Sequence, residues 1–425
     1  MELGPILATL RCHKLTTALL AMQVALTCTV ICNAVFLVVQ RVARVEIPSG
    51  LDERGLVLVN VDDLQVGPNP LSLHQADVAA LRALPDVESA AIVNDVPFSG
   101  VQNAMGVCGS LAAIHTMAAS GQQMNSAHAC AEPTAYHGGR EALHTLGLQL
   151  VAGRDFHADE YIPGKRDYAM GSVPAAIISQ ALADRLYPSH PRAAVGRSLY
   201  FGSMGFAHIG SIRVVGVVKH LQRSLLRGAA RNDLSMLLPV ESNHDAVTFA
   251  LRSKPANRKR VMAEALALLN RRRPVRQLTS ADAETFTQVR AHFFGHDTAM
   301  IGMLLAATCG LLFVTAIGVA GLASFWVQQR TRSIGIRRAL GATRRDILRY
   351  FQTENFLIVT FGIVPGMILA VGVNLLLMRH YAIPRLPLWY LPLTALALWL
   401  LGQLAVLAPA LKASRVSPME ATRNV

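Results

Sequence analysis

The residues of this sequence that could do chemistry do not assemble into a known catalytic motif. The 425 residues contain no His-Glu-x-x-His zinc motif, no Gly-x-Ser-x-Gly nucleophile elbow and no Cys-x-x-Cys pair. His157, Asp159 and Glu160 form a small polar cluster, but their spacing alone does not make a metal site. We therefore expect no catalytic residue, no metal and no directly bound cofactor.

Two of the six cysteines, Cys108 and Cys130, lie in the long polar segment of the chain. If this segment faces an oxidising compartment, a disulfide between them and two free thiols are both compatible with the sequence. The other four lie in or beside apolar runs, where cysteine usually acts as a small packing residue. They are Cys12, Cys28, Cys32 and Cys309.

The most concentrated chemistry in the sequence is positive charge. The chain carries 40 Lys and Arg against 27 Asp and Glu, a formal net charge of +13, which in a soluble protein would suggest nucleic acid binding. Residues 40–297 are nearly balanced, with 26 basic and 23 acidic residues, whereas the stretch 328–352 holds seven arginines and one acid. The basic runs 258–260 and 271–273 flank an expected amphipathic helix (257–270) and have no interleaved aromatic residues. We therefore expect no nucleic acid partner.

Four long apolar runs predict helices that span a lipid bilayer. The expected spans are residues 15–39, 298–327, 353–378 and 388–411, and each exceeds the roughly 20 residues that cross a membrane. Gly362, Pro365, Gly366 and Gly372 interrupt the third run, and spanning helices tolerate such residues. The few polar side chains inside the spans are Gln23, Asn33, Glu354, Asn374 and Gln403. The Asn and Gln side chains are expected to bond neighbouring helices.

The distribution of Lys and Arg orients these spans. Short loops rich in Lys and Arg face the cytoplasm, which places the tails 1–14 and 412–425 and the loop 328–352 inside. Segments 40–297 and 379–387 then lie outside. Arg41 and Arg44 follow the first span on the outer side and contradict this rule.

The outer domain, residues 40–297, mixes helix and strand patterns. Helices are expected over 72–84, with Ser72 as the N-cap, and over 179–186. Strands are expected over 87–93, 175–178, 212–218 and 246–251. The small-residue stretch 104–131 is typical of a loop-like insertion.

An approximate capping box at Thr279 predicts a stalk helix that starts at about residue 280 and continues into the second span. A linker broken at Gly295 is an equally good alternative. The predicted fold class is a membrane α-helical protein with four transmembrane helices and a large α+β domain between the first and second helices.

The loop after the second span carries a specific pattern. It reads QQRTRSIGIRRALGATRRDIL, in which Gly341 separates a helical segment at 334–340 from a helix that starts at Arg344, with Thr343 as its N-cap. The pattern resembles the signature of FtsX-like and MacB-like ABC transporter permeases, as do the chain end from Pro409 and the outer-domain segments 153–156, 174–186, 196–197 and 214–218. The resemblance assigns coupling to an ATPase to Arg332, Ile334, Gly335, Ile336, Arg337, Arg338, Ala339, Gly341, Ala342, Arg344 and Arg345, and it places Glu354 as a carboxylate at the inner interface beside a loop arginine.

The resemblance implies that no substrate crosses the bilayer through the permease. Two permease copies, as a homodimer or a heterodimer with a related permease, pair with cytoplasmic ABC ATPase subunits that use ATP and Mg²⁺. The loop docks on the ATPase, and the spans pass its motion to a periplasmic domain. A periplasmic adaptor and an outer-membrane channel are further expected partners. The expected location is the bacterial inner membrane, and the expected cargo is peptides, lipoproteins or other small amphiphiles.

The chain departs from the family pattern in two places. Ser333 stands where the family usually has Glu, so a charge that could contact the ATPase is missing. A Gly-x-x-x-x-Gly-Lys-Ser/Thr motif is also missing, so we expect the ATPase on another chain and no enzymatic activity in this one. The alternative functions are a membrane sensor, disfavoured by the short tail 412–425, and a division-type regulator that activates a partner.

Overall fold

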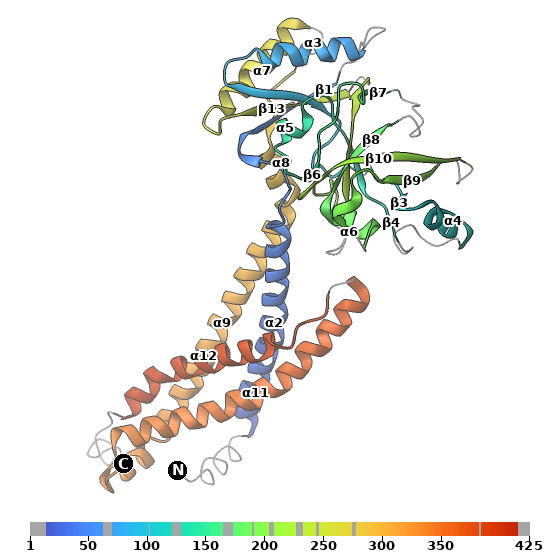
Figure 1. Cartoon of the computed structure of the whole chain (residues 1–425). Coiled ribbons are helices and arrows are strands. Elements are labelled where there is room, and N and C mark those ends of the chain that lie inside the picture. Colours follow the sequence, from blue (N-terminus) through green and yellow to red (C-terminus); the bar gives the residue numbers. More distant parts are fainter. Residues whose placement is uncertain are drawn as a thin grey trace. The chain divides into compact units, whose positions relative to one another are not determined.

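The structure is a computed structural model that describes residues 14–62, 70–101, 103–120, 129–164, 173–188, 191–203, 208–226, 233–243, 246–273, 278–381 and 384–414. The chain divides into two compact units (Figure 1). The membrane unit comprises the residues up to Glu46 and those from His296 onward, and the outer unit comprises Ile47–Gly295. The predicted family motif beyond Ser414 lies outside the described residues.

Among the described residues of the membrane unit, four helices are long and apolar enough to cross a bilayer. They are α2 (Lys14–Val45), α9 (Gly295–Gln329), α11 (Arg344–Tyr381) and α12 (Tyr390–Ser414), and the short helix α10 (Thr331–Ala339) connects α9 to α11 (Figure 1). Each predicted span coincides with one of these four helices. The predicted four-helix membrane fold is therefore confirmed.

Small residues let α11 pack closely on α2. A Cβ atom added to Gly362 would lie 2.6 Å from Cβ of Val24, and one added to Gly366 would lie 2.7 Å from Cβ of Cys28. The two glycines are four residues apart and share one face of α11, the small-xxx-small arrangement that brings membrane helices together. Two of the residues that interrupt the third predicted span thus form its packing surface.

Polar side chains of the spans bond neighbouring helices. Thr29 Oγ1 of α2 donates to the carbonyl of Gly366 at 3.0 Å, and Asn33 Nδ2 donates to that of Ala370 at 3.1 Å. The hydroxyls of Thr27 and Thr315 lie 2.9 Å apart and link α2 to α9. Gln23 bonds the carbonyl of Val314 in α9, and Gln403 bonds that of Gln352 in α11. Asn374 instead accepts from the N–H of Leu386, in the segment between α11 and α12.

Arg41 and Arg44, which conflict with the positive-inside rule, have an acidic partner. Both side chains pair with Asp297 near the start of α9, and Asp297 is only 6% exposed. The carboxylate offsets part of the positive charge. The same contacts tie the end of α2 to the start of α9.

A four-stranded antiparallel sheet forms one part of the outer unit. In order, its strands are β14 (Ala283–Thr285), β1 (Leu56–Asp62), β13 (Ala246–Ser253) and β2 (Val87–Val93). Helices α3 (Pro70–Arg82) and α7 (Arg258–Arg272) pack on it (Figure 1). Their apolar faces and the strands form one core, whose fully buried residues include Val57, Val59, Leu81, Phe249, Leu251, Val261, Ala265 and Leu269.

A larger mixed sheet forms the other part. In order, its strands are β4 (Cys130–Ala131), β3 (Val107–Cys108), β9 (Ser198–Ser203), β10 (His208–Val218), β8 (Ala175–Ser179), β11 (Ser235–Leu238) and β5 (Thr134–His137), and β6 (Leu150–Gly153) pairs with β10. Strand β8 pairs in parallel with β10 and is followed by helix α6 (Gln180–Leu186), which buries Leu182 and Leu186 in the core of this sheet. A separate pair consists of β7 (Ile162–Gly164) and β12 (Val240–Ser242), and α5 (Ala142–Leu146) follows β5. All four predicted strands are present, as β2 and within β8, β10 and β13.

The prediction that residues 104–131 form a loop-like insertion is wrong. The described residues of this stretch form β3, helix α4 (Leu111–Ser120) and β4, and they add an edge to the larger sheet. Ile114 and Met117 of α4 pack against Cys108 and Cys130, which are joined by a disulfide. An alanine-rich run is a good helix former, and the cystine gives this short helix something to pack on.

Two predicted helix starts are also wrong. α3 begins at Pro70 and not after Ser72, because the fixed φ of proline suits the first turn of a helix.

Thr279 bonds Asp282 in a turn that precedes β14, so no helix starts there. Helix α8 (Phe286–Phe293) starts after Thr285, which forms a capping box with Gln288. A single non-helical residue, Phe294, then separates α8 from α9, next to the break proposed at Gly295.

We expect Gly366→Leu to destabilise the membrane unit. The added side chain meets the backbone and Cβ atoms of α2 at less than 3 Å, and overpacking of this kind costs about 1–3 kcal/mol. Thermal unfolding of the detergent-purified protein measures the effect. Gly372→Ala is the control, because a Cβ there meets nothing within 4 Å. Equal unfolding temperatures for the two variants would contradict the packing argument.

Asp95, in the loop after β2, is a buried carboxylate of the outer unit. It is 7% exposed, its Oδ1 accepts from the N–H of Val96 at 2.8 Å, and its Oδ2 has no hydrogen-bond partner among the described residues. Burial penalises the charged form and raises the pKa of Asp95 to about 6, although hydrogen bonds from Ser99 and Val96 act in the opposite direction.

This raised pKa predicts that the outer unit loses stability as the pH rises from about 4 to above 6. The folded state binds the Asp95 proton more tightly than the unfolded chain, so the free energy of unfolding falls by about 3 kcal/mol across this window. Asp95→Asn should flatten this dependence and raise the unfolding temperature at pH 8. Asp159→Asn, at an exposed position, is the control. A lower unfolding temperature for Asp95→Asn at pH 8 would refute the prediction.

Candidate functional site: the loop between α9 and α11

Two local signals shape residues 330–352, a segment that comprises α10 and the first turns of α11 and is called here the α9–α11 loop. Gly341 follows α10 with a φ of +102°, in the left-handed region that favours glycine. The N–H of Ala342 donates to the carbonyl of Arg337 at 3.0 Å, a bond that closes the helix in a Schellman arrangement. α11 starts after Thr343, whose Oγ1 accepts from the N–H of Asp346, while Asp346 Oδ2 accepts from the N–H of Thr343. Gly341 therefore ends one helix, and Thr343 starts the next at the predicted position.

One side chain of α10 reaches the interior of the membrane unit. Ile334 is 6% exposed, and its neighbour Gly335 is also buried. Ile334 packs in an apolar cluster, called here the four-helix cluster, that draws on every membrane helix. The other members are Leu20 of α2, Val319, Ala323, Trp326 and Val327 of α9, Ile347, Phe351 and Ile358 of α11, and Val406, Ala410 and Ala413 of α12. A displacement of α10 would therefore act on all four helices at once.

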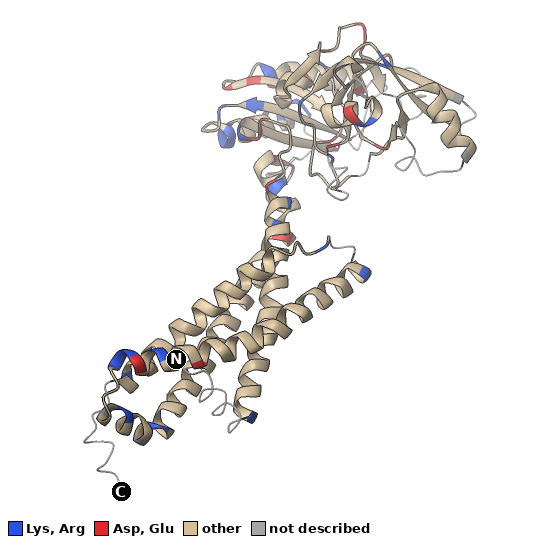
Figure 2. Ribbon diagram, turned by 60° about the horizontal axis from the view of Figure 1, so that its bottom comes forward, with Lys and Arg blue, Asp and Glu red and all other residues tan. Residues whose placement is uncertain are grey.

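Most of the described side chains of α10 and the following turn are exposed. Leu340 is 83% exposed and Ile336 is 51% exposed. Figure 2 shows Lys and Arg along this part of the chain, and the nearby Arg337, Arg344 and Arg345 are exposed as well. Five of the other predicted residues are exposed: Arg337, Ala339, Gly341, Arg344 and Arg345. Ala342 is half-buried, and the side chains of Arg332 and Arg338 lie outside the described part of the structure. Ser333 is exposed as well.

Leu340 belongs to this surface but is not among the predicted site residues. Its N–H donates to the carbonyl of Ile336 at 3.0 Å, the last helical bond of α10. The sequence signal that could have identified Leu340 is its position as an apolar residue directly before Gly341, the glycine that ends a short basic helix.

At the base of the loop, Arg330 and Glu354 form a buried ion pair. Arg330 Nη1 lies 3.0 Å from both carboxylate oxygens, and the two side chains are 15% and 2% exposed. The guanidinium of Arg330 also lies 5.9 Å from the ring centre of Trp326, and that of Arg337 lies 5.1 Å from the ring centre of Tyr350. Glu354 thus has a loop arginine as its partner, and both arginines hold the loop against the membrane helices.

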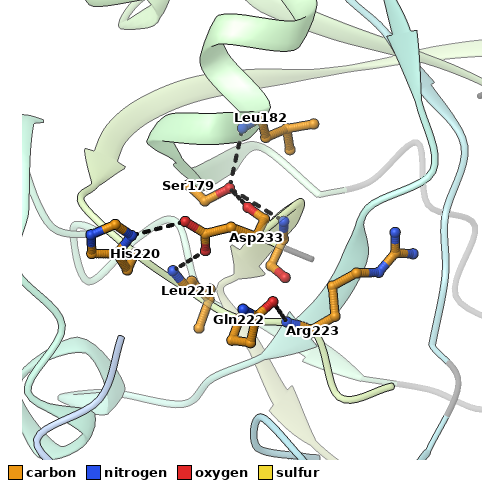
Figure 3. Close-up of polar contacts among 8 residues, drawn as sticks. Ser179, Leu182, His220, Leu221, Gln222, Arg223 and Asp233 are labelled. Atoms are coloured by element: carbon orange, nitrogen blue, oxygen red, sulfur yellow. Dashed lines mark hydrogen bonds and ion pairs between the residues drawn. The ribbon is translucent and has the colours of Figure 1, made fainter. Parts of the chain in front are cut away.

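A serine, a histidine and an aspartate approach one another in the outer unit, but their bonds anchor a loop (Figure 3). Ser179 caps α6: its Oγ accepts from the N–H of Leu182 at 3.3 Å and donates to the backbone carbonyl of Asp233. His220 Nδ1 lies 3.0 Å from Asp233 Oδ2, and Asp233 Oδ1 accepts from the N–H of Leu221 at 2.9 Å. Burial raises the pKa of Asp233 although His220 and Leu221 act against this. The serine hydroxyl is therefore directed at a backbone carbonyl and not at the imidazole.

The polar cluster of His157, Asp159 and Glu160 is braced by Arg154. Two guanidinium nitrogens of Arg154 donate to the two oxygens of Glu160 at 2.7 and 2.8 Å, and Glu160 also accepts from the N–H of His157. The bond to Arg154 lowers the pKa of Glu160 to about 2. No group of three His, Cys, Asp or Glu among the described residues could hold a metal ion.

The fold and the loop together define a class of membrane protein. Four apolar helices carry an extracellular α+β domain between the first and the second, and an arginine-rich helical loop joins the second to the third. Residues 305–418 match the family model of the FtsX-like permease C-terminal domain. The chain therefore contains an FtsX-like permease domain, as the loop pattern indicated.

The relatives of the chain are ABC transporter permeases. It is 26% identical over 299 residues to the macrolide export ATP-binding/permease protein MacB of Agrobacterium fabrum. The match covers 67% of this chain and 42% of MacB. It is 26% identical over 291 residues to the uncharacterized ABC transporter permease YknZ of Bacillus subtilis, and the match covers 66% of this chain and 67% of YknZ. It is 28% identical over 272 residues to the pyoverdine export ATP-binding/permease protein PvdT of Pseudomonas entomophila, and the match covers 60% of this chain and 38% of PvdT. The predicted resemblance to MacB-like permeases is confirmed, and the chain spans less than half the length of MacB and PvdT.

A solved structure of the extracellular domain of the ABC-type transporter YknZ from Gram-positive bacteria also matches. It covers 51% of this chain and 95% of that chain, at 15% identity and a TM-score of 0.29. A TM-score this low does not establish a shared fold.

We expect Glu354→Ala to destabilise the membrane unit strongly. Removing one partner of a buried ion pair leaves an uncompensated charge at a cost of about 3–5 kcal/mol. The double variant Arg330→Met with Glu354→Met should recover most of this loss, because no buried charge remains. Thermal unfolding in detergent measures all three proteins. A double variant no more stable than Glu354→Ala would show that the two charges do not depend on each other.

Proposed function

We propose that this chain is the permease subunit of an ABC exporter in the bacterial inner membrane. A cytoplasmic ABC ATPase, which binds ATP and Mg²⁺, docks on the α9–α11 loop. Its motion passes through the membrane helices to the extracellular domain, which drives the export of peptides, lipoproteins or other small amphiphiles. The names of the relatives support this proposal, because MacB and PvdT combine an ATP-binding part with a permease part for export.

The observation that carries the proposal is the two-sided character of α10. Its inward residue, Ile334, is buried in the four-helix cluster. Its outward residues, Ile336 and Leu340, expose aliphatic surface beside arginines. Isolated exposed apolar side chains are common, but a pair of them on a basic helical loop fits a protein partner with a mixed apolar and acidic surface. Force applied to this face would reach every membrane helix.

The interior of the membrane unit supports transmission of motion and not passage of substrate. The polar side chains predicted inside the spans form hydrogen bonds or an ion pair with neighbouring segments. They therefore hold helices together and do not line a polar path. Such bonds, with close glycine packing, let a helix move as a rigid body.

A second permease copy and a periplasmic adaptor with an outer-membrane channel complete the proposed assembly. Helix α9 supports the second copy, because much of its apolar surface is uncovered within this chain. Its exposed residues include Met303, Leu305, Phe313, Val314, Ile317 and Phe325. The second permease is the same chain or a related one.

We expect Leu340→Glu to reduce the amount of ABC ATPase that co-purifies with the protein from native membranes at least tenfold. A carboxylate at an 83% exposed position should leave the fold intact and repel an acidic partner surface. Mass spectrometry of the purified complex quantifies the ATPase. Leu111→Glu, an exposed leucine on α4 of the outer unit, is the matched control. Undiminished ATPase with Leu340→Glu and a normal unfolding temperature would overturn the docking assignment.

A further inference from the structure

One side chain joins the two chain connections of the outer unit. The chain enters this unit at Ile47 after α2 and leaves it at Gly295, the first residue of α9. Arg290, in the last turn of α8, donates from Nη2 to the carbonyl of Ile47 and from Nη1 to Oε1 of Glu53, both at 2.6 Å. A single guanidinium therefore holds the exit helix against the entry segment.

The ion pair is partly buried and held in place. The side chains of Arg290 and Glu53 are 20% and 24% exposed. Ser49 Oγ donates to the same Glu53 oxygen at 2.7 Å, which fixes the carboxylate. Charge-assisted hydrogen bonds of this kind are stronger than neutral ones and set a defined geometry. The entry segment thus presents a carbonyl and a carboxylate in the positions that one arginine can reach.

The same guanidinium lies against aromatic rings. It is 5.1 Å from the ring centre of Phe98 and 5.6 Å from that of Phe294. Phe98 is 1% exposed, and its ring lies 5.1–6.3 Å from those of Phe286, Phe293 and Phe294. Phe98 also adopts a φ of +66°, a left-handed conformation that is costly for an aromatic residue. Its surroundings must hold it there, and Arg290 is part of them.

The Phe98 loop leads from this contact to the larger sheet. The N–H of Phe98 donates to the carbonyl of Arg223 at 3.4 Å, and that of Gly100 donates to the carbonyl of Ser224 at 3.1 Å. Ser224 Oγ donates in turn to the carbonyl of Val101. Residues 223 and 224 follow β10, the strand that pairs with β6, β8 and β9. These contacts therefore run from both chain connections to the segment that follows β10, a central strand of this sheet.

We propose that Arg290 is a positioning residue that makes the entry and exit segments move together, so that displacement of the membrane helices is delivered to the larger sheet through Phe98. This inference rests on the proposed function. In the membrane unit, the pairing of Arg41 and Arg44 with Asp297 joins the end of α2 to the start of α9. It therefore couples the same two chain segments on the membrane side. Without Arg290 the last turn of α8 would lose its bonds to the entry segment, while the pairing of β14 with β1 would still hold the start of α8.

The test uses the full-length protein in lipid nanodiscs with its co-purified ATPase. Hydrogen–deuterium exchange of residues 95–101 and 222–226 is compared with and without ATP and vanadate. We expect a nucleotide-dependent change in the parent, a change at least threefold smaller in Arg290→Gln, and partial rescue by Arg290→Lys, which keeps the charge opposite Glu53. The amount of bound ATPase should be the same in all variants.

The matched control is Arg82→Gln. Arg82 of α3 also donates to a backbone carbonyl, that of Ala90 at 2.9 Å, and also pairs with a carboxylate, Glu141 at 3.3 Å. It lies outside the Arg290–Phe98 contacts, so it should lower the unfolding temperature without reducing the nucleotide response. If Arg290 only stabilised the fold, Arg290→Gln would likewise lower the unfolding temperature and leave the nucleotide response unchanged.

The outcomes separate the two proposals. A full nucleotide response in Arg290→Gln, or an equal loss in Arg82→Gln, would overturn the role of Arg290 and leave the proposed function standing. A parent protein that binds no ATPase would overturn the proposed function and this inference with it. A response lost only in Arg290→Gln supports both.

Discussion

No polar group inside a bilayer can exchange a lost partner for water, and the membrane unit is built around this constraint. The hydroxyl of Thr29 and the amide of Asn33 bond carbonyls of α11, and the charge of Glu354 is met by Arg330. These bonds require close helices. Gly362 and Gly366 provide the close approach, because any larger side chain would meet α2.

Bonds and close packing of this kind hold neighbouring helices together. The contacts at the two ends of the bundle then decide what the helices are joined to. At one end Ile334 anchors α10 in the four-helix cluster, so a partner that moves α10 moves the bundle. At the other end Asp297 holds α2 and α9 together through two arginines. Within the outer unit, Arg290 holds the two segments that continue those helices. The proposed mechanical role needs few reactive groups, and the Ser179 hydroxyl serves as a helix cap.

The sequence predicted well where one local property decides the structure. Span length and hydropathy identified four helices, and the residue before a basic helical turn, Thr343, identified the start of α11. The predictions were wrong where two local signals compete. Thr279 and Thr285 both carry capping patterns. Only Thr285 is the last residue of a strand, β14, and the pairing of β14 with β1 ends there, so the helix starts after Thr285. The stretch 104–131 looked like a loop because its small residues give no periodicity, and its helix is defined by packing on a cystine.

The sequence by itself determined the membrane spans, the arginine-rich loop between the second and third, and the kinship with FtsX-like permeases, because these depend on composition and short-range spacing. Only the tertiary structure decided which charges meet. Arg41 with Asp297 and Arg290 with Glu53 join residues more than 200 positions apart, and no local pattern in the chain encodes such pairs. Their partners are selected by how the helices and sheets pack.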